Sequence, residues 1–165
     1  MGISDRHTYA ASIEAVQAMF ADEAFIREKY EGMGHREVRI DECERTDDGL
    51  TVRSSRVVEI DLPGFAKRVM QPVNTVTQVD TWTSDGAGGW TGTFEVVVKG
   101  PPVRTSGTMT LTPGDGSCVH EVSLAMEVKV PIVGGKIRDW AEKNEAPGTL
   151  AGEFAAGDAW IAAHP

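Results

Sequence analysis

An alternation of apolar and polar residues runs through most of the segment 38–130 and constrains the fold more than any other feature of the sequence. Successive side chains of a β-strand point to opposite faces of a sheet, so this alternation is typical of strands with one buried face. Turn-forming clusters of Asp, Gly and Pro interrupt the pattern at 47–49, 85–89, 100–102 and 113–116. The pattern predicts six strands, joined mainly as hairpins. A longer connection at 61–72 carries a predicted turn at Pro63-Gly64, and 65–70 is compatible with one helical turn or a loop.

One more strand and two short helices are predicted near the N-terminus. Residues 3–9 also alternate and predict a first strand, so the expected sheet has seven strands. Ser12 and Asp22 can each cap a short helix, because small polar side chains accept hydrogen bonds from the free amides at a helix N-terminus. Gly32 and Gly34 are expected to end the second helix.

The C-terminal segment 132–163 is rich in helix-forming residues and predicts one long helix. Pro147 and Gly148 interrupt it, so we expect a kink or a break near Ala146. A helix of this length can cross a wide sheet diagonally. The sequence therefore predicts one α+β domain over residues 1–165, with a curved antiparallel sheet of seven strands around a long C-terminal helix.

The register of the hairpins can be predicted by aligning the apolar faces across each turn, because a slip of one residue sends the whole apolar set to the other face. Around the turn at 85–89, this places Trp82 opposite Trp90, Gln78 opposite Phe94, and Val76 opposite Val96. The next two hairpins place Val96 opposite Thr105, Phe94 opposite Gly107, Gly107 opposite Val122, Thr105 opposite Leu124, and Val103 opposite Met126. One face of the sheet thereby collects most of the large apolar side chains.

A ligand cavity is expected over this apolar face. One helix need not fill the interior of a strongly bent sheet, and pockets arise in such places. The candidate ligand-binding residues are Arg56, Gln78, Asp80, Trp82, Phe94, Val96, Thr105, Met109, His120, Val122, Leu124, Met126, Trp140 and Phe154. The Trp82–Trp90 pair is more typical of core packing than of a binding platform. Gly92 and Gly107 lie in mid-strand and are expected to make room for a ring, a bulge or a ligand.

Polar residues on the apolar face are the candidates for chemistry, since buried polar groups need partners. Arg56 and Glu42 fall diagonally across one hairpin, within reach of an ion pair. Arg56 then either anchors a carboxylate or carbonyl group of a ligand or forms a pair at the solvated edge of the sheet. His120 shares a row with Met109 and Asp80, but three strand spacings separate it from the acid by roughly 14 Å, too far for a catalytic dyad. His120 is thus either a lone general base or a solvated residue near a turn, and no catalytic residue is assigned.

Charge and residue spacing limit the partners. The chain has 25 acidic and 16 basic residues, a net charge of -9 and a pI near 4.9, which argues against nucleic acid as a partner. No apolar run approaches the roughly 20 residues that cross a bilayer, and residues 1–9 lack a signal-peptide pattern, so we expect no membrane span and a cytoplasmic location. Cys43 and Cys118 are predicted to be free thiols, and no spacing predicts a metal site or a cofactor.

The order of predicted elements, and four sequence stretches, resemble a known superfamily over nearly the whole chain. The stretches are Asp80-Thr81-Trp82, Thr91-Gly92-Thr93-Phe94, Gly107-Thr108-Met109-Thr110-Leu111 with Pro113, and Val128-Lys129-Val130-Pro131-Ile132-Val133-Gly134-Gly135-Lys136-Ile137. They are similar to an uncharacterised bacterial family within the START-related superfamily (SRPBCC), which includes the birch-pollen allergen fold and polyketide cyclase-like proteins. The resemblance implies a helix-grip fold and an internal hydrophobic cavity. It implies no particular chemistry, because the superfamily holds carriers, hormone receptors, cyclases, hydrolases and chaperone regulators.

Three functions remain open from the sequence. The first is binding or carriage of a hydrophobic, lipid- or polyketide-like small molecule in the cavity. The second is a cyclase- or hydrolase-like enzyme that uses His120, Asp80 or Arg56, which would require two of these side chains to converge on one pocket. The third is a protein-interaction module, for which a large exposed apolar patch or a homodimer interface would be the sign.

Overall fold

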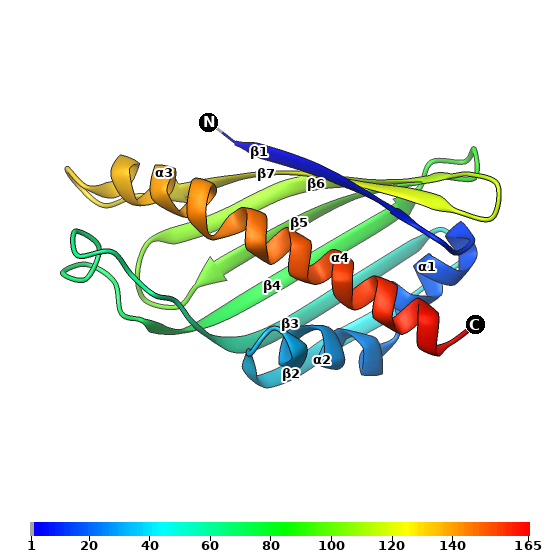
Figure 1. The fold of residues 1–165 in the computed structure, drawn as a ribbon, viewed down its shortest axis with the longest axis horizontal. Coiled ribbons are helices and arrows are strands. Elements are labelled where there is room, and N and C mark those ends of the chain that lie inside the picture. The colour runs from blue at the N-terminus through cyan, green and yellow to red at the C-terminus, as the bar shows by residue number, and fades with distance from the viewer. Residues whose placement is uncertain (1) are drawn as a thin grey trace.

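The computed structural model describes residues 2–165. Within that range, the chain forms seven strands and four helices: β1 (Ile3–Tyr9), α1 (Ile13–Phe20), α2 (Glu23–Gly32), β2 (Arg36–Arg45), β3 (Gly49–Glu59), β4 (Val73–Ser84), β5 (Trp90–Val98), β6 (Val103–Pro113), β7 (Cys118–Val128), α3 (Gly134–Asn144) and α4 (Ala146–Ala163). Figure 1 shows a curved sheet with α3 and α4 running along its concave side. The predicted α+β helix-grip architecture is confirmed, including two short helices between the first two strands.

All seven strands form one antiparallel sheet, in the order β1-β7-β6-β5-β4-β3-β2. Strands β2 to β7 are neighbours both in sequence and in space, as expected for hairpins. Strand β1 instead pairs with β7, so the first and last strands of the chain lie side by side. Because β1 and β2 then lie at opposite edges of the sheet, α1 and α2 have to connect the two edges, and they do so on the concave side (Figure 1).

Local sequence explains where the short helices begin and end. The Oγ of Ser12 accepts a hydrogen bond from the amide of Ala15 at 3.2 Å, and Oδ1 of Asp22 accepts one from the amide of Ala24 at 2.9 Å. These caps satisfy amides that have no partner within the helix. Gly34 follows α2 with a φ of 86°, a conformation that glycine adopts without a steric cost. Both predicted caps and the predicted stop are confirmed.

One of the three predicted hairpin registers is confirmed, and two are wrong by two residues. Between β5 and β6, Phe94 lies opposite Gly107 and Val96 opposite Thr105, as predicted. In the other two hairpins, the structure pairs Val76 with Val98, Gln78 with Val96, Trp82 with Gly92, Val103 with Val128, Thr105 with Met126, and Gly107 with Leu124. A shift of two residues keeps every side chain on its face, so the same residues still line the concave side.

Both register errors come from where the turns are centred, one residue later along the chain than the predicted pairings require. After β4, Ser84 pairs with Trp90, so the turn has the predicted bounds 85–89 and is centred on Ala87. After β6, Pro113 pairs with Cys118 and belongs to the strand, although its proline predicted a turn. The apolar pattern repeats every two residues and therefore cannot separate registers that differ by two.

The long connection between β3 and β4 is a loop of turns. The amide of Met70 donates to the carbonyl of Ala66 at 2.9 Å, which makes a single helical turn rather than a helix. Leu62, Ala66 and Met70 are buried and pack with Val103 and Ile137 in a small apolar cluster. The loop therefore covers one end of the concave face.

The C-terminal helix bends where the sequence predicts. Helix α3 ends at Asn144, and α4 begins at Ala146, with Glu145 between them. Pro147 lies in the first turn of α4, where its missing N–H group is tolerated. Among the described residues, no helix has the length and apolar character needed to cross a membrane.

Glycines allow close packing on the concave side. A Cβ atom on Gly92 would lie 2.9 Å from the Trp82 ring, and one on Gly107 would lie 2.7 Å from the Phe94 ring. Of the alternatives considered for these two glycines, the structure therefore supports room for a ring. Gly157 plays the same part in α4, because a Cβ there would lie 2.6 Å from the ring of Tyr9 in β1.

We predict that Gly157→Ala destabilises the protein although alanine is the better helix former. Overpacking of this kind costs about 1–3 kcal/mol, because α4 has to move away from β1. Urea unfolding followed by circular dichroism measures the change.

Gly152→Ala is the matched control in the same helix. Its Cβ would lie 3.5 Å from Met33, an ordinary contact, so the variant is expected to gain about 0.5–1 kcal/mol from helix propensity. Equal stabilisation by both substitutions would show that the contact between Gly157 and Tyr9 is not tight.

Candidate functional site

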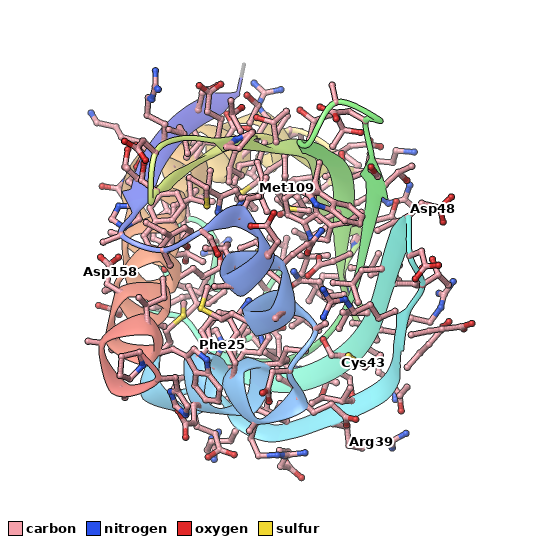
Figure 2. All side chains as sticks on the ribbon, turned by 90° about the vertical axis from the view of Figure 1, so that its right-hand side faces the viewer. Phe25, Arg39, Cys43, Asp48, Met109 and Asp158 are labelled. Atoms are coloured by element: carbon pink, nitrogen blue, oxygen red, sulfur yellow. The ribbon has the colours of Figure 1, made fainter. Side chains whose placement is uncertain are left out.

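A cavity of about 280 Å³ lies between the concave face of the sheet and the C-terminal helix. Helix α3 packs on β7, and α4 packs on β1 and α2, so the helical layer rests largely on one edge of the sheet and on another helix. Figure 2 looks into this interior from one end, with Met109 and Phe25 directed inward and Arg39 and Asp48 directed outward.

All fourteen residues predicted as cavity candidates line the cavity. They come from β3 (Arg56), β4 (Gln78, Asp80, Trp82), β5 (Phe94, Val96), β6 (Thr105, Met109), β7 (His120, Val122, Leu124, Met126), α3 (Trp140) and α4 (Phe154). The placement of the twelve strand residues follows from the strand alternation, which a register error of two residues does not change, while Trp140 and Phe154 come from the C-terminal helix. Whether they bind a ligand stays a prediction.

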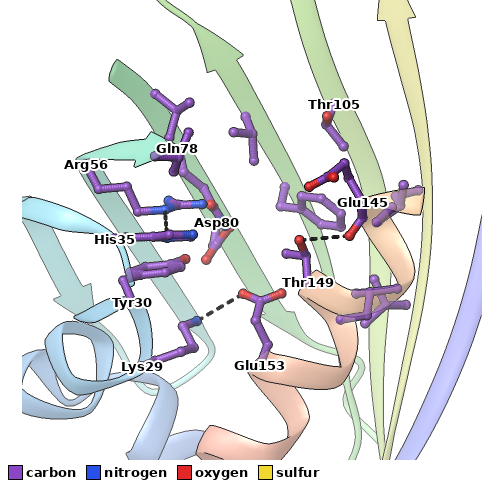
Figure 3. Close-up of a pocket in the computed structure, with 18 of the residues that line it drawn as sticks. Lys29, Tyr30, His35, Arg56, Gln78, Asp80, Thr105, Glu145, Thr149 and Glu153 are labelled. Atoms are coloured by element: carbon purple, nitrogen blue, oxygen red, sulfur yellow. Dashed lines mark hydrogen bonds and ion pairs between the residues drawn. The ribbon is translucent and has the colours of Figure 1, made fainter. Parts of the chain in front are cut away.

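A chain of hydrogen-bonded polar side chains crosses one wall of the cavity (Figure 3). Nε of Arg56 donates to Nδ1 of His35 at 3.0 Å, and Nη1 of Arg56 donates to Oε1 of Gln78 at 2.9 Å. Nε2 of Gln78 then donates to Oδ1 of Asp80 at 2.9 Å. Arg56 and Gln78 are buried, so these bonds offset the loss of their contacts with water.

The ring of Tyr30 lies against this chain. Cζ of Arg56 is 3.8 Å from the ring centroid, and Nζ of Lys29 is 4.6 Å from it. Both cations therefore interact with the electron-rich ring. The imidazole of His35 stacks on the same ring, with centroids 5.8 Å apart and an interplanar angle of 15°. Tyr30 thus holds Arg56 and His35 in place from the side of α2.

An ion pair between α2 and α4 completes the polar group. Nζ of Lys29 lies 3.5 Å from Oε1 of Glu153, with the two side chains 13% and 27% exposed. In Figure 3, Glu153 points from α4 toward Lys29, while Asp80 faces the same space from the sheet. We call the set Lys29, Tyr30, His35, Arg56, Gln78, Asp80 and Glu153 the polar cluster.

Burial and neighbouring charges shift the pKa values in the polar cluster. Burial by itself lowers the pKa of Lys29, but the neighbouring Tyr30 and Glu153 outweigh it, and the pKa stands above its usual value. Burial raises the pKa of Asp80, against the opposing effects of Lys29 and of the hydrogen bond from Gln78. Burial, and then the charge of Arg56, lower the pKa of His35 to about 4. His35 is therefore neutral at pH 7, which leaves its Nδ1 free to accept the bond from Arg56.

Two predicted side-chain relations are wrong. Glu42 pairs with Arg53 at 2.8 Å and not with Arg56, because Glu42 lies directly opposite Arg53 across β2 and β3, whereas Arg56, three residues further along β3, points to the other face. On β6, the partner of His120 is Leu111 and not Met109, so the expected row from His120 to Asp80 does not exist.

Four residues of the polar cluster were not predicted as site residues from the sequence: Lys29, Tyr30, His35 and Glu153. A signal for Lys29 was present, because it follows Phe25 by four residues and therefore lies on the buried face of an amphipathic helix. Glu153 similarly follows the buried Leu150 by three residues. A charged residue on an apolar helix face is a stronger indication of a site than one at the edge of a strand.

The described residues contain no arrangement typical of a metal site. Within 2–165, no group of three or more His, Cys, Asp or Glu side chains is placed to hold a metal ion. Cys43 and Cys118 are both free thiols. Burial raises the pKa of Cys118 to about 11, so this thiol stays protonated at pH 7.

We predict that Lys29→Met lowers the free energy of unfolding by about 1–3 kcal/mol, because Glu153 is left in a largely buried place without its partner. The double variant Lys29→Met/Glu153→Met should regain most of that loss, since neither charge remains. Arg6→Met breaks the exposed pair of Arg6 with Glu121, whose side chains are 68% and 54% exposed, and serves as control with a smaller effect. Urea unfolding of the four proteins tests this, and a double variant no more stable than Lys29→Met would contradict it.

We predict that acidification from about pH 6.5 to pH 4 destabilises the protein in part through His35. Its folded-state pKa of about 4 lies below its unfolded value, so over this range only the unfolded chain takes up the proton. The raised pKa of Asp80 has the opposite effect on the pH dependence of stability. The contribution of His35 is therefore found by comparing the wild-type protein with a His35 variant. His35→Asn, which keeps an acceptor for Arg56, should show a shallower loss of stability in urea titrations at several pH values. An unchanged pH dependence would contradict the prediction.

The chain is similar in fold to several solved structures. A protein from Thermus thermophilus has a TM-score of 0.64 at 16% identity, with 100% of both chains covered. A START superfamily protein from Mycobacterium smegmatis has a TM-score of 0.52 at 15% identity, with 99% of both chains covered. Norcoclaurine synthase from Thalictrum flavum has a TM-score of 0.56 at 16% identity, with 99% of this chain and 87% of that chain covered. At these identities, the likeness shows that the fold is shared, and it gives no information about activity.

Comparison with curated protein sequences finds no match. A family model described as "Protein of unknown function (DUF2505)" matches residues 4–161, which include every strand from β2 to β7 and most of the C-terminal helix. The predicted START-like fold is confirmed. The chain therefore belongs to the DUF2505 family and has the START-like helix-grip fold.

Proposed function

We propose that this protein binds, and in that form carries, a hydrophobic lipid- or polyketide-like small molecule in the cavity between the sheet and α4. The observation that carries the proposal is one continuous cavity whose wall is mostly apolar, with a single connected polar cluster. Apolar pockets with a few convergent polar groups are typical of small-molecule sites. The apolar wall supplies affinity through burial, and the polar cluster orients the ligand.

The polar cluster favours a particular kind of head group on this ligand. Lys29 and Arg56 are cations, while Glu153 and Asp80 are the acids that face them. Among the described residues, Arg56 donates its side-chain hydrogen bonds to His35 and Gln78 and forms no ion pair, so its positive charge is not paired within the cluster. Ligands with an uncharged polar or an anionic head group are therefore preferred over cationic ones.

The enzyme alternative has less support. Its requirement that two candidate side chains meet in one pocket is met by Arg56 and Asp80, which are linked through Gln78, and one similar structure is a synthase. However, these hydrogen bonds already engage both groups. The raised pKa of Lys29 keeps its amine protonated, which is unfavourable for a nucleophile.

The protein-interaction alternative has no matching surface. Among residues 2–165, the large apolar side chains that are exposed are Val69, Val73 and Ile132, too few to form a broad apolar patch.

We predict that Val96→Trp reduces affinity for the fluorescent probe 1-anilinonaphthalene-8-sulfonate at least about tenfold, because the new ring occupies the cavity. Val97→Trp is the matched control, since Val97 follows in the same strand, points to the opposite face and does not line the cavity. Fluorescence titration gives both affinities.

Native mass spectrometry of freshly purified protein, followed by solvent extraction, searches for the bound molecule itself. Equal probe affinity in the two tryptophan variants, together with an unliganded mass, would refute the proposed function.

A further inference from the structure

His120 is a buried histidine whose ring nitrogens have no protein partner. Its side chain projects from β7 into the wall of the cavity, and the residue is 8% exposed. Among the described residues, neither Nδ1 nor Nε2 has a hydrogen-bond partner. Such groups are rare in folded proteins, because a buried donor or acceptor without a partner forfeits the hydrogen bonds it made with water.

Aromatic rings surround the imidazole. The ring centroids of Phe20, Phe154, Trp82 and Tyr9 lie 5.4, 5.6, 5.8 and 6.1 Å from that of His120. All four of these residues also line the cavity. His120 thus lies in an aromatic part of the wall, together with the hydroxyl of Tyr9 and the indole N–H of Trp82, and such a wall suits a planar ring.

The imidazole is neutral in this place. Burial, and then the neighbouring Lys29 and His7, lower the pKa of His120 to about 3. A neutral imidazole offers one N–H donor and one acceptor nitrogen. A hydroxyl group can satisfy either nitrogen, because it donates and accepts, whereas the aromatic surroundings disfavour a charged group.

A second histidine nearby, His7, does have a side-chain partner. Nε2 of His7, on the neighbouring β1, lies 2.8 Å from Oδ1 of Asp158, and its ring stacks on Phe154. His7 does not line the cavity. Of the two histidines that contact Phe154, only His120 has both nitrogens left to recognise a ligand.

We propose that His120 forms a second polar subsite, separate from the polar cluster, which selects ligands that carry a hydroxyl group on a planar ring. The inference rests on the proposed function, since it concerns a molecule bound in the same cavity. It narrows the ligand class from hydrophobic molecules in general to planar ring compounds that carry a hydroxyl group, such as phenols and naphthols.

The test compares two probes that differ in one group, 2-naphthol and 2-methylnaphthalene, by their displacement of 1-anilinonaphthalene-8-sulfonate at pH 7. The wild-type protein should prefer 2-naphthol roughly three- to tenfold, the range expected for one hydrogen bond between neutral groups. His120→Phe and His120→Leu should abolish this preference and still bind 2-methylnaphthalene. His7→Phe is the matched control, and it should retain the preference.

A measurement on the unaltered protein makes the result independent of how the variants fold. Nitrogen NMR of the His120 imidazole should shift on addition of 2-naphthol and stay unchanged with 2-methylnaphthalene. Equal affinity for the two probes, or a preference that persists in both His120 variants, overturns the subsite and leaves the proposed function standing. Failure of both probes to displace the dye counts against the cavity as a binding site at all, and hence against both proposals.

Discussion

A single helical layer has to cover the concave face of a seven-stranded sheet, and the cavity follows from that mismatch. The C-terminal helix packs on β7 and β1, at one edge of the sheet, and also on helix α2. Gly157 lets it approach Tyr9 closely there. Side chains from the middle strands β4, β5 and β6 then reach into a space that the helix does not fill. The loop between β3 and β4 covers the end of the concave face near α3 with its own small apolar cluster.

The polar cluster lies where α2 comes closest to α4, and it connects both helices to the sheet. Lys29 reaches Glu153 across that gap, while Tyr30 supports the guanidinium of Arg56. Buried charges are expensive unless each is paired and hydrogen-bonded. Here Lys29 is paired with Glu153, while Arg56 and Asp80 are hydrogen-bonded to uncharged side chains. These bonds join separate segments of the chain, so the geometry of the cluster depends on the whole fold being formed.

His120 differs from the polar cluster in this respect. Arg56, Gln78 and Asp80 have hydrogen-bond partners within the cluster, whereas neither ring nitrogen of His120 has a partner among the described residues. An unsatisfied group of this kind lowers stability, and proteins retain such costs mainly at functional sites. The cavity wall thus contains both the polar cluster, whose side chains bond to one another, and His120, whose ring nitrogens are left for a ligand.

The sequence by itself determined the elements, the caps at Ser12 and Asp22, the bend near Ala146 and which strand residues face inward, because these follow from local hydrogen bonding and from a period of two. That was enough to place fourteen cavity residues on the right face. Only the tertiary structure decided the registers, which differ by an even number of residues and look alike in the pattern. It also decided the partners of Arg56 and the isolation of His120, because those depend on where α2 and α4 pack against the sheet.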